Sequence, residues 1–152
     1  MKNKQYEQII TQLPALLECN NYEITILSNA SALLNLYMTD INWVGFYLNI
    51  DNVLQLGPFQ GKPACTTIPF SKGVCGLCAS KQQTIVVENV HEFPGHIACD
   101  TASNSEICVP IFVNNSFYGL LDIDSPSFSR FDNIDKSNLE IIVKIIENAL
   151  NN

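Results

Sequence analysis

Three cysteines of the chain lie in irregular segments marked by glycine or proline, where thiol chemistry is possible. They are Cys65 in GKPAC, Cys75 in KGVCG and Cys99 in GHIACD. Loops can approach one another, and a reactive thiol must be partly exposed. His96 precedes Cys99 by three residues and can either tune that thiol or hold its loop in shape. Three loop cysteines with a nearby histidine favour a thiol-based reaction.

A metal site and a redox pair are the alternatives for the same cysteines. Cys75-x-x-Cys78, together with His96-x-x-Cys99, offers a formal Cys3His zinc set for a zinc-stabilised interaction protein. The Cys75–Cys78 spacing equally suits a dithiol redox pair, and Cys78 can also be a small apolar residue on the inner face of a helix. Zinc is the less favoured hypothesis, because such motif matches are often false and a domain with an adequate core does not need structural zinc.

FYGLLDIDS carries two carboxylates on one face of an expected strand. Strand periodicity places Asp122 and Asp124 on one face and Leu121 and Ile123 on the other. Two carboxylates on an apolar strand are costly unless they are exposed, paired or functional. If this face meets solvent, the pair needs no further explanation. Otherwise the strand is the floor of a cavity for a cation or an ammonium group, and crowding raises the pKa of one carboxyl, which can then donate a proton.

The same alternation applies to NWVGFY and places Trp43, Gly45 and Tyr47 on one face of a strand. A glycine between two aromatic residues leaves a slot in which a thioether or a quaternary-like cation can lie against the rings. Packing in the core is the simpler alternative. The slot hypothesis applies if the two aspartates line the same cavity.

The periodicity of the whole chain predicts an α+β domain that holds these segments. Apolar residues at helical spacing predict helices, and aromatic and β-branched runs bounded by turn residues predict strands. Asp132 is an expected N-cap with Asp135 placed as in a capping box, and Pro14 can break or kink the first helix. The expected order is helices over 4–19 and 21–38, a hairpin over 41–59, a strand over 66–70, a short helix in KGVCGLCASKQ, a strand over 84–90, a polar loop over 91–105, a hairpin over about 106–124, and a last helix that runs to about 149. This order favours a central antiparallel sheet with helices packed largely on one face.

Length and composition limit the class of protein. The 152 residues are most simply one domain, 1–152, and 47% hydrophobic with 15% charged residues argue against disorder. A formal net charge of -7, with only eight Lys and Arg, disfavours nucleic-acid and membrane-surface binding. No segment resembles a membrane span or a secretory signal, so the expected location is cytoplasmic. Cys19 and Cys108, among apolar neighbours, are expected to be buried thiols, as a reducing cytosol allows.

Five segments, in the same order and at matching spacing, resemble the free methionine-(R)-sulfoxide reductase family. They are TDINWVGFYL, LGPFQGKPAC, IPFSKGVCG, VHEFPGHIACDTASNSEI and GLLDIDSPSFSRFD. The resemblance extends over about residues 29–146. Members are stand-alone GAF domains that reduce the R epimer of free methionine sulfoxide. Their fold, an antiparallel sheet with helices packed against it, agrees with the order of elements expected above.

The resemblance also implies a role for each candidate residue. Cys99 matches the attacking cysteine, and Cys65 and Cys75 match the other two active-site cysteines. Cys65 is favoured as the resolving partner that closes a disulfide, whereas the order of Cys75 and Cys99 in the attack stays open. The other matching residues are an acidic set that holds substrate, Glu106, Asp122 and Asp124, and an aromatic wall, Trp43 and Tyr47. Cys78 departs from the small or apolar residue of the family and leaves open a pairing with Cys75, whereas Cys108 replaces an apolar position with little expected effect.

The implied reaction is thiol chemistry without a metal or organic cofactor. A thiolate attacks the sulfoxide sulfur, a carboxylic acid protonates the sulfoxide oxygen, and the cysteine is left as a sulfenic acid. A second thiol condenses with it to a disulfide, which an external dithiol such as thioredoxin reduces. The acidic cavity suits the ammonium group of the substrate, and the resemblance alone implies a homodimer. The alternative is a sensory GAF module that binds a small ligand such as a cyclic nucleotide, which has no need of three loop cysteines.

Overall fold

Six antiparallel strands form one sheet in the order β3-β2-β1-β6-β5-β4. The computed structural model describes residues 1–18, 22–96 and 101–151. β1 and β6 lie in the middle of the sheet, and each pairs with its neighbour in sequence, β1 with β2 and β6 with β5. The strands are β1 (Trp43–Ile50), β2 (Val53–Gly61), β3 (Thr67–Pro69), β4 (Ile85–Val87), β5 (Ser105–Val113) and β6 (Ser116–Ser125).

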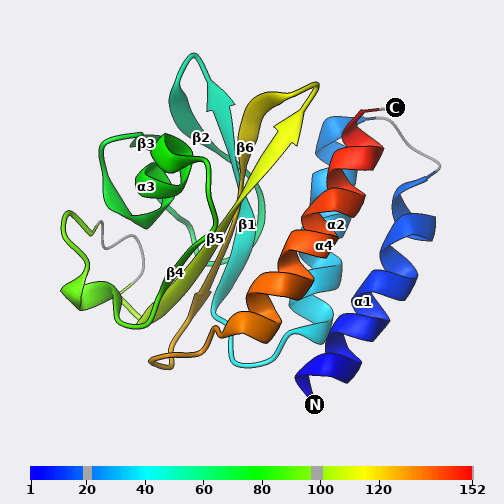
Figure 1. Ribbon diagram of the computed structural model, residues 1–152, viewed down its shortest axis with the longest axis horizontal. Coiled ribbons are helices and arrows are strands. Elements are labelled where there is room, and N and C mark those ends of the chain that lie inside the picture. Colours follow the sequence, from blue (N-terminus) through cyan, green and yellow to red (C-terminus); the bar gives the residue numbers. More distant parts are fainter. Residues whose placement is uncertain (19–21, 97–100, 152) are drawn as a thin grey trace.

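Three α-helices cover one face of this sheet (Figure 1). They are α1 (Lys2–Leu17), α2 (Glu23–Tyr37) and α4 (Asn133–Leu150), whereas α3 (Gly73–Lys81) lies on the opposite side. A short 3-10 turn, η1 (Val90–Glu92), follows β4. The arrangement confirms the α+β class with a central antiparallel sheet and helices largely on one face. Within the described ranges, no helix is both long and apolar enough to cross a membrane.

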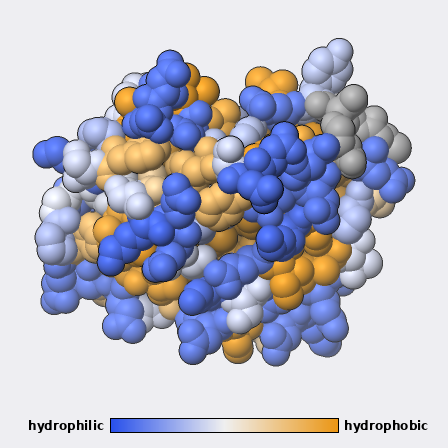
Figure 2. All heavy atoms as spheres, turned by 45° about the horizontal axis from the view of Figure 1, so that its top comes forward, coloured by the Kyte–Doolittle hydropathy of each residue, from blue (hydrophilic) through white to orange (hydrophobic). Residues whose placement is uncertain are grey.

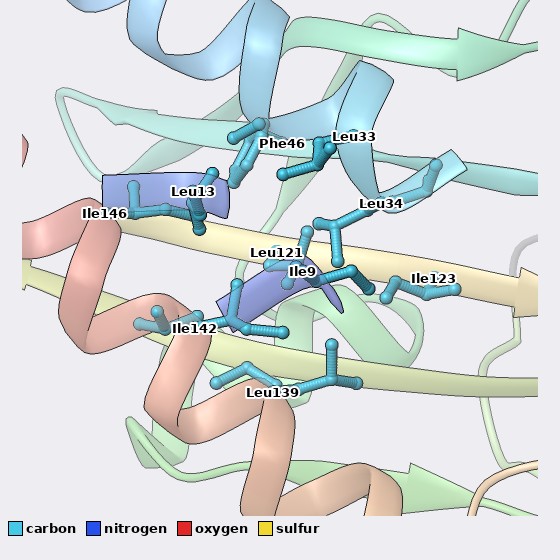
Figure 3. Close-up of a cluster of buried hydrophobic side chains, with 14 of the residues drawn as sticks. Ile9, Leu13, Leu33, Leu34, Phe46, Leu121, Ile123, Leu139, Ile142 and Ile146 are labelled. Atoms are coloured by element: carbon cyan, nitrogen blue, oxygen red, sulfur yellow. The ribbon is translucent and has the colours of Figure 1, made fainter. Parts of the chain in front are cut away.

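The larger hydrophobic core lies between the sheet and these three helices (Figure 3). Leu121 and Ile123 of β6 belong to it and are fully buried. The helices contribute, among others, Ile9, Leu13, Leu34, Leu139, Ile142 and Ile146. Because side chains alternate along a strand, Asp122 and Asp124 face the other side of the sheet, as predicted.

Both tight hairpins turn through residues with positive φ. Asp51 and Asn52 have φ of 53° and 64° between β1 and β2, and Asn114 and Asn115 have φ of 52° and 62° between β5 and β6. Two consecutive positive φ values are typical of a type I′ turn, whose twist matches that of the strands and which Asn and Asp tolerate well. The turns therefore fix the register of each hairpin, including that of β5 against β6.

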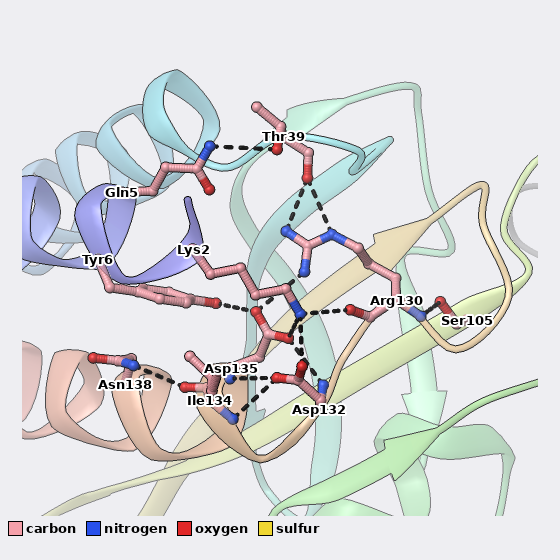
Figure 4. A network of polar contacts seen from close by, with 10 residues as sticks. All are labelled: Lys2, Gln5, Tyr6, Thr39, Ser105, Arg130, Asp132, Ile134, Asp135 and Asn138. Atoms are coloured by element: carbon pink, nitrogen blue, oxygen red, sulfur yellow. Dashed lines mark hydrogen bonds and ion pairs between the residues drawn. The ribbon is translucent and has the colours of Figure 1, made fainter.

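A buried carboxylate ties the N-terminal helix to the start of α4 (Figure 4). Asp135 is fully buried and accepts hydrogen bonds from Tyr6 Oη at 2.6 Å, Lys2 Nζ at 2.6 Å and Arg130 Nη1 at 3.1 Å. It also forms the predicted capping box with Asp132, in which each side chain accepts a hydrogen bond from the backbone N–H of the other. One carboxylate therefore links the N-terminal helix to the segment 130–135, which is far from it in sequence.

The structure corrects two local expectations. α1 runs through Pro14 without a break, because this proline is exposed while the neighbouring Leu13 is buried in the core and holds the helix to it. β4 ends at Val87, earlier than expected, because the Asn89 side chain accepts a hydrogen bond from the backbone N–H of His91 and starts η1.

The outer surface carries polar and apolar residues side by side. On the face in Figure 2, hydrophilic residues are spread throughout, with apolar residues in smaller groups between them. Tyr22, Ile24 and Leu36, at the edge of α2 or within it, are among the exposed large apolar side chains. Apolar exposure of this scattered kind is normal on proteins and needs no partner to explain it.

Candidate active site

A cavity lies on the face of the sheet opposite the three-helix layer, next to α3. Six residues that the sequence singles out in its expected strands and in KGVCG line it: Trp43, Tyr47, Cys75, Glu106, Asp122 and Asp124. They come from α3 and from the three strands β1, β5 and β6, and they give the cavity an aromatic wall and an acidic wall. The fold thus brings together side chains that are up to 81 residues apart, Trp43 and Asp124.

Three carboxyl groups share one face of β5 and β6. Glu106 is opposite Asp124 in the strand register, and Cys108 is opposite Asp122. Glu106 and Asp122 are 7% and 4% exposed and Asp124 is partly buried, so contact with solvent does not account for Asp122. Burial raises the pKa of Glu106 well above its ordinary value, and the Asp122 carboxylate raises it further. Burial and Asp124 likewise raise the pKa of Asp122. Carboxyl groups buried together cannot all ionise readily, so the cluster favours a protonated carboxyl group.

Two buried thiols contact these carboxyl groups. The Sγ atoms of Cys75 and Cys108 are each 3.6 Å from Glu106 Oε2, and Cys108 Sγ is 3.3 Å from Asp122 Oδ1. The two sulfur atoms are 3.5 Å apart. The hydrogen bond with Cys108 lowers the pKa of Cys75, but burial and the Glu106 carboxylate outweigh it and raise that pKa to about 11. Cys75 is therefore a protonated thiol at neutral pH and a poor nucleophile.

Trp43 and Tyr47 line the cavity and also hold the segment that carries Cys65. Trp43 Nε1 donates a hydrogen bond to the backbone oxygen of Lys62 at 3.1 Å, and Tyr47 Oη donates one to the backbone oxygen of Cys65 at 2.8 Å. Both aromatic residues are almost completely buried, and their rings stack with centroids 5.9 Å apart. The aromatic wall therefore fixes the position of the Cys65 backbone relative to the cavity.

The slot expected over Gly45 is filled by the protein itself. Gly45 pairs with Phe59 of β2, and a Cβ atom at Gly45 would collide with the Phe59 Cβ. The Phe59 ring stacks on Trp43 with centroids 5.2 Å apart. The slot hypothesis is therefore wrong for Gly45, and the packing alternative explains this glycine, because the pairing of β1 with β2 places a large side chain exactly opposite a residue without one.

Cys65 takes part in a disulfide. Cys75, Cys78 and Cys108 carry free thiols, so none of these three is its partner. The Cys75–Cys78 pairing that the sequence leaves open is not formed. Cys99, the expected attacking residue, lies outside the described residues, as does Cys19.

The zinc hypothesis finds no support in the part of the chain that the structure describes. Cys78 is fully buried on the inner side of α3, in agreement with the role of a small apolar residue. His96 lines the cavity and its backbone N–H donates to Phe93, while burial and His91 lower the pKa of its imidazole. The described groups that are close enough to share an ion are instead Cys75, Glu106, Cys108 and Asp122.

Three residues of the site are not among the site residues predicted from the sequence. Lys72 lines the cavity at the N-cap of α3, and the buried Ser103 lines it as well and accepts a hydrogen bond from Asn42 Nδ2 at 3.1 Å. Cys108 is fully buried, as predicted, but it contacts the acidic cluster. Its signal is present in the sequence, since it lies two residues after Glu106 in a strand and so on the same face.

Comparisons with known proteins agree with this fold and site. The six-stranded sheet, its helices and the cavity define a GAF domain, and the model of the GAF domain family matches residues 9–150. The free methionine-R-sulfoxide reductase of Escherichia coli is 47% identical over 149 residues, which cover 98% of this chain and 90% of that protein. The chain therefore belongs to the free methionine-R-sulfoxide reductase family of GAF domains.

Solved structures give the same result. The reduced form of fRMsr from Staphylococcus aureus has a TM-score of 0.93 at 56% identity, covering 95% of this chain and 94% of that one. The free methionine-R-sulfoxide reductase of Neisseria meningitidis in complex with its substrate has a TM-score of 0.91 at 39% identity, covering 95% and 87%. The likeness therefore extends over nearly the whole of each chain.

Proposed function

We propose that this chain reduces free methionine-(R)-sulfoxide to methionine. The observation that carries the proposal is the cavity in which three carboxyl groups, Glu106, Asp122 and Asp124, share a space with Trp43 and Tyr47. The relatives from Escherichia coli and Neisseria meningitidis, which carry the name of this activity, support it. An acidic wall suits an ammonium group, and an aromatic wall suits the methyl-sulfur end of the same small molecule.

In the proposed reaction, the Cys99 thiolate attacks the sulfoxide sulfur. The oxygen passes from the substrate sulfur to the cysteine sulfur with the uptake of one proton, so methionine and a cysteine sulfenic acid are formed. The Cys65 thiol then attacks the sulfenic sulfur, which releases water and closes a disulfide. A dithiol such as thioredoxin returns this disulfide to two thiols by exchange. The disulfide state of Cys65 and its tether to Tyr47 support its assignment as the resolving cysteine.

The surroundings of Cys75 favour Cys99 as the attacking residue. Cys75 is buried beside Glu106 and Cys108, and the hydrogen bond with Cys108 lowers the pKa of its thiol less than burial and the Glu106 carboxylate raise it. Cys75 lines the cavity and can contact substrate there, but its thiol stays protonated. The nucleophile of the reaction must be a thiolate, so we assign the attack to Cys99 and a supporting place in the cavity wall to Cys75.

Glu106 is the proposed proton donor to the sulfoxide oxygen. It lines the cavity, is more buried than Asp124, and has the Asp122 carboxylate beside it, so its protonated form is favoured. A general acid of this kind contributes about 10²- to 10⁴-fold to a rate. Asp122 and Asp124 are then left to hold the ammonium group.

A thioredoxin-coupled assay on separate epimers tests the proposed function. We expect turnover of free methionine-(R)-sulfoxide, and none of the free S epimer or of the R epimer within a peptide. A peptide adds bulk at both ends of the residue and removes the ammonium charge that the acidic wall is proposed to bind. Absence of turnover with every substrate, together with tight binding of a cyclic nucleotide, would favour the sensory module instead.

The Glu106→Gln variant is expected to lower kcat by about 10²-fold or more, because glutamine keeps the shape of the side chain but has no acidic proton to give. Kinetics with the free R epimer measure the effect. Glu140→Gln, a carboxylate on the exposed side of α4 that contacts Thr84, is the matched control and should retain full activity. An unchanged kcat for Glu106→Gln contradicts the assignment of the proton donor.

A further inference from the structure

Four potential ligands for a metal ion converge at the acidic wall of the cavity: Cys75, Glu106, Cys108 and Asp122. The pairing of β5 with β6 sets Cys108 opposite Asp122, and strand alternation puts Glu106 on the same face as Cys108. α3 packs over this face and supplies Cys75. All four residues are buried, and one ligand atom of each lies within 4.8 Å of the others.

Four of the six separations among these atoms are close to the edges of a small tetrahedron. The two sulfur atoms are 3.5 Å apart, each is 3.6 Å from Glu106 Oε2, and Cys108 Sγ is 3.3 Å from Asp122 Oδ1. A tetrahedral zinc ion with bonds of about 2.3 Å to sulfur and about 2.0 Å to oxygen sets two sulfurs about 3.8 Å apart and a sulfur and an oxygen about 3.5 Å apart. The atoms are therefore already near the places that such an ion requires.

We propose that Cys75, Glu106, Cys108 and Asp122 form a site for a thiophilic divalent cation such as Zn²⁺, and that the bound ion inhibits the enzyme. Three of the four side chains line the cavity, so the ion can enter by the path of the substrate. Each thiol, and each of the two carboxyl groups that is protonated, releases its proton to solvent as its sulfur or oxygen donates an electron pair to the ion. The inhibition rests on the proposed function, because the ion takes Glu106 and Asp122 away from the substrate. The binding of the ion is independent of that function.

The chemistry of the ligand set selects the kind of ion. Two thiolates favour Zn²⁺, Co²⁺ or Cd²⁺, whereas Mg²⁺ prefers six oxygen ligands and retains its water. This site also differs from the zinc set suggested by the sequence, with which it shares only Cys75. Two cysteines distinguish the two sets in an experiment. Cys108 belongs only to the proposed site, and Cys78, three residues after Cys75, belongs only to the set suggested by the sequence.

Cobalt binding tests the site without reference to enzyme activity. Reduced protein titrated with cobalt chloride is expected to bind one Co²⁺ per chain and to develop sulfur-to-cobalt charge-transfer and tetrahedral d–d absorption bands. Cys108→Val should remove these bands, and the matched control Cys78→Val should retain them. Persistence of the bands in Cys108→Val, their loss in Cys78→Val, or their absence from the wild-type chain overturns the proposal. Glu106→Gln, which keeps both thiols, provides a second variant and should shift the d–d bands and weaken binding.

Zinc chloride tests the inhibition. We expect zinc, but not magnesium chloride, to inhibit reduction of the free R epimer competitively with substrate, and a chelator to reverse the effect. Each variant is compared with its own rate without metal, and Cys108→Val should lose at least most of the inhibition while Cys78→Val keeps it. If the chain shows the cobalt bands but zinc does not inhibit it, the inhibitory role is overturned. If the chain binds cobalt but reduces no methionine sulfoxide, the proposed function is contradicted and the metal site remains supported.

Discussion

Replacing Cys99 by serine is expected to lower the turnover of free methionine-(R)-sulfoxide by on the order of 10⁴-fold or more, as the loss of a nucleophile does in other enzymes. A serine hydroxyl is a much weaker nucleophile than a thiolate at sulfur, and it forms neither a sulfenic acid nor a disulfide. The thioredoxin-coupled assay measures the rate. Thermal unfolding of the same sample checks that the variant remains folded.

Two other cysteine variants make this result specific. Cys78→Val alters a buried thiol outside the proposed machinery and should keep the wild-type rate. Cys65→Ser should still form methionine once, at about one equivalent per chain, because the first step needs only the attacking thiolate. It should then stop, because no disulfide forms for thioredoxin to reduce. Full activity of Cys99→Ser would move the attack to Cys75 or end the proposed mechanism.

Strand alternation explains why much of the acidic wall is predictable. In FYGLLDIDS the apolar residues Leu121 and Ile123 identify the face that joins the large core, so Asp122 and Asp124 must face the other way. The capping box at Asp132 is equally local, because its three-residue spacing is the spacing of one helical turn. Features of this kind depend on the backbone geometry of a single element.

Features that depend on a second segment are not predictable in the same way. Whether Gly45 leaves an open slot depends on Phe59 in the neighbouring strand. The contact between Cys75 and Cys108 likewise requires α3 to pack on β5. No periodicity in either segment specifies the other. The pKa of Cys75 follows from that same packing, since burial and the surrounding carboxyl groups come from β5 and β6.

The Asp135→Asn variant is expected to be less stable than the wild-type chain by about 3–5 kcal/mol, because it breaks a buried ionic network by removing one partner. The Asp135 side chain has no exposed surface, and its carboxylate is bound by Lys2, by Arg130 and by the hydroxyl of Tyr6. Asparagine keeps the size of the side chain but removes its charge, so the Arg130 guanidinium, whose side chain is only 8% exposed, loses its buried counter-charge.

Thermal and urea unfolding measure this effect, and for a chain of 152 residues the loss corresponds to a fall in Tm of about 10 °C. Lys144→Ala is the matched control, because it removes an ion pair whose lysine is 79% exposed and should change stability by less than about 1 kcal/mol. The reductase rate at a temperature where both variants are folded should be unchanged, since Asp135 lies at the junction of α1 and α4, on the opposite side of the sheet from the cavity. A loss in Asp135→Asn no larger than that in Lys144→Ala would show that the network does not join the two ends of the chain energetically, and that the apolar contacts between α1 and α4 are sufficient to hold them together.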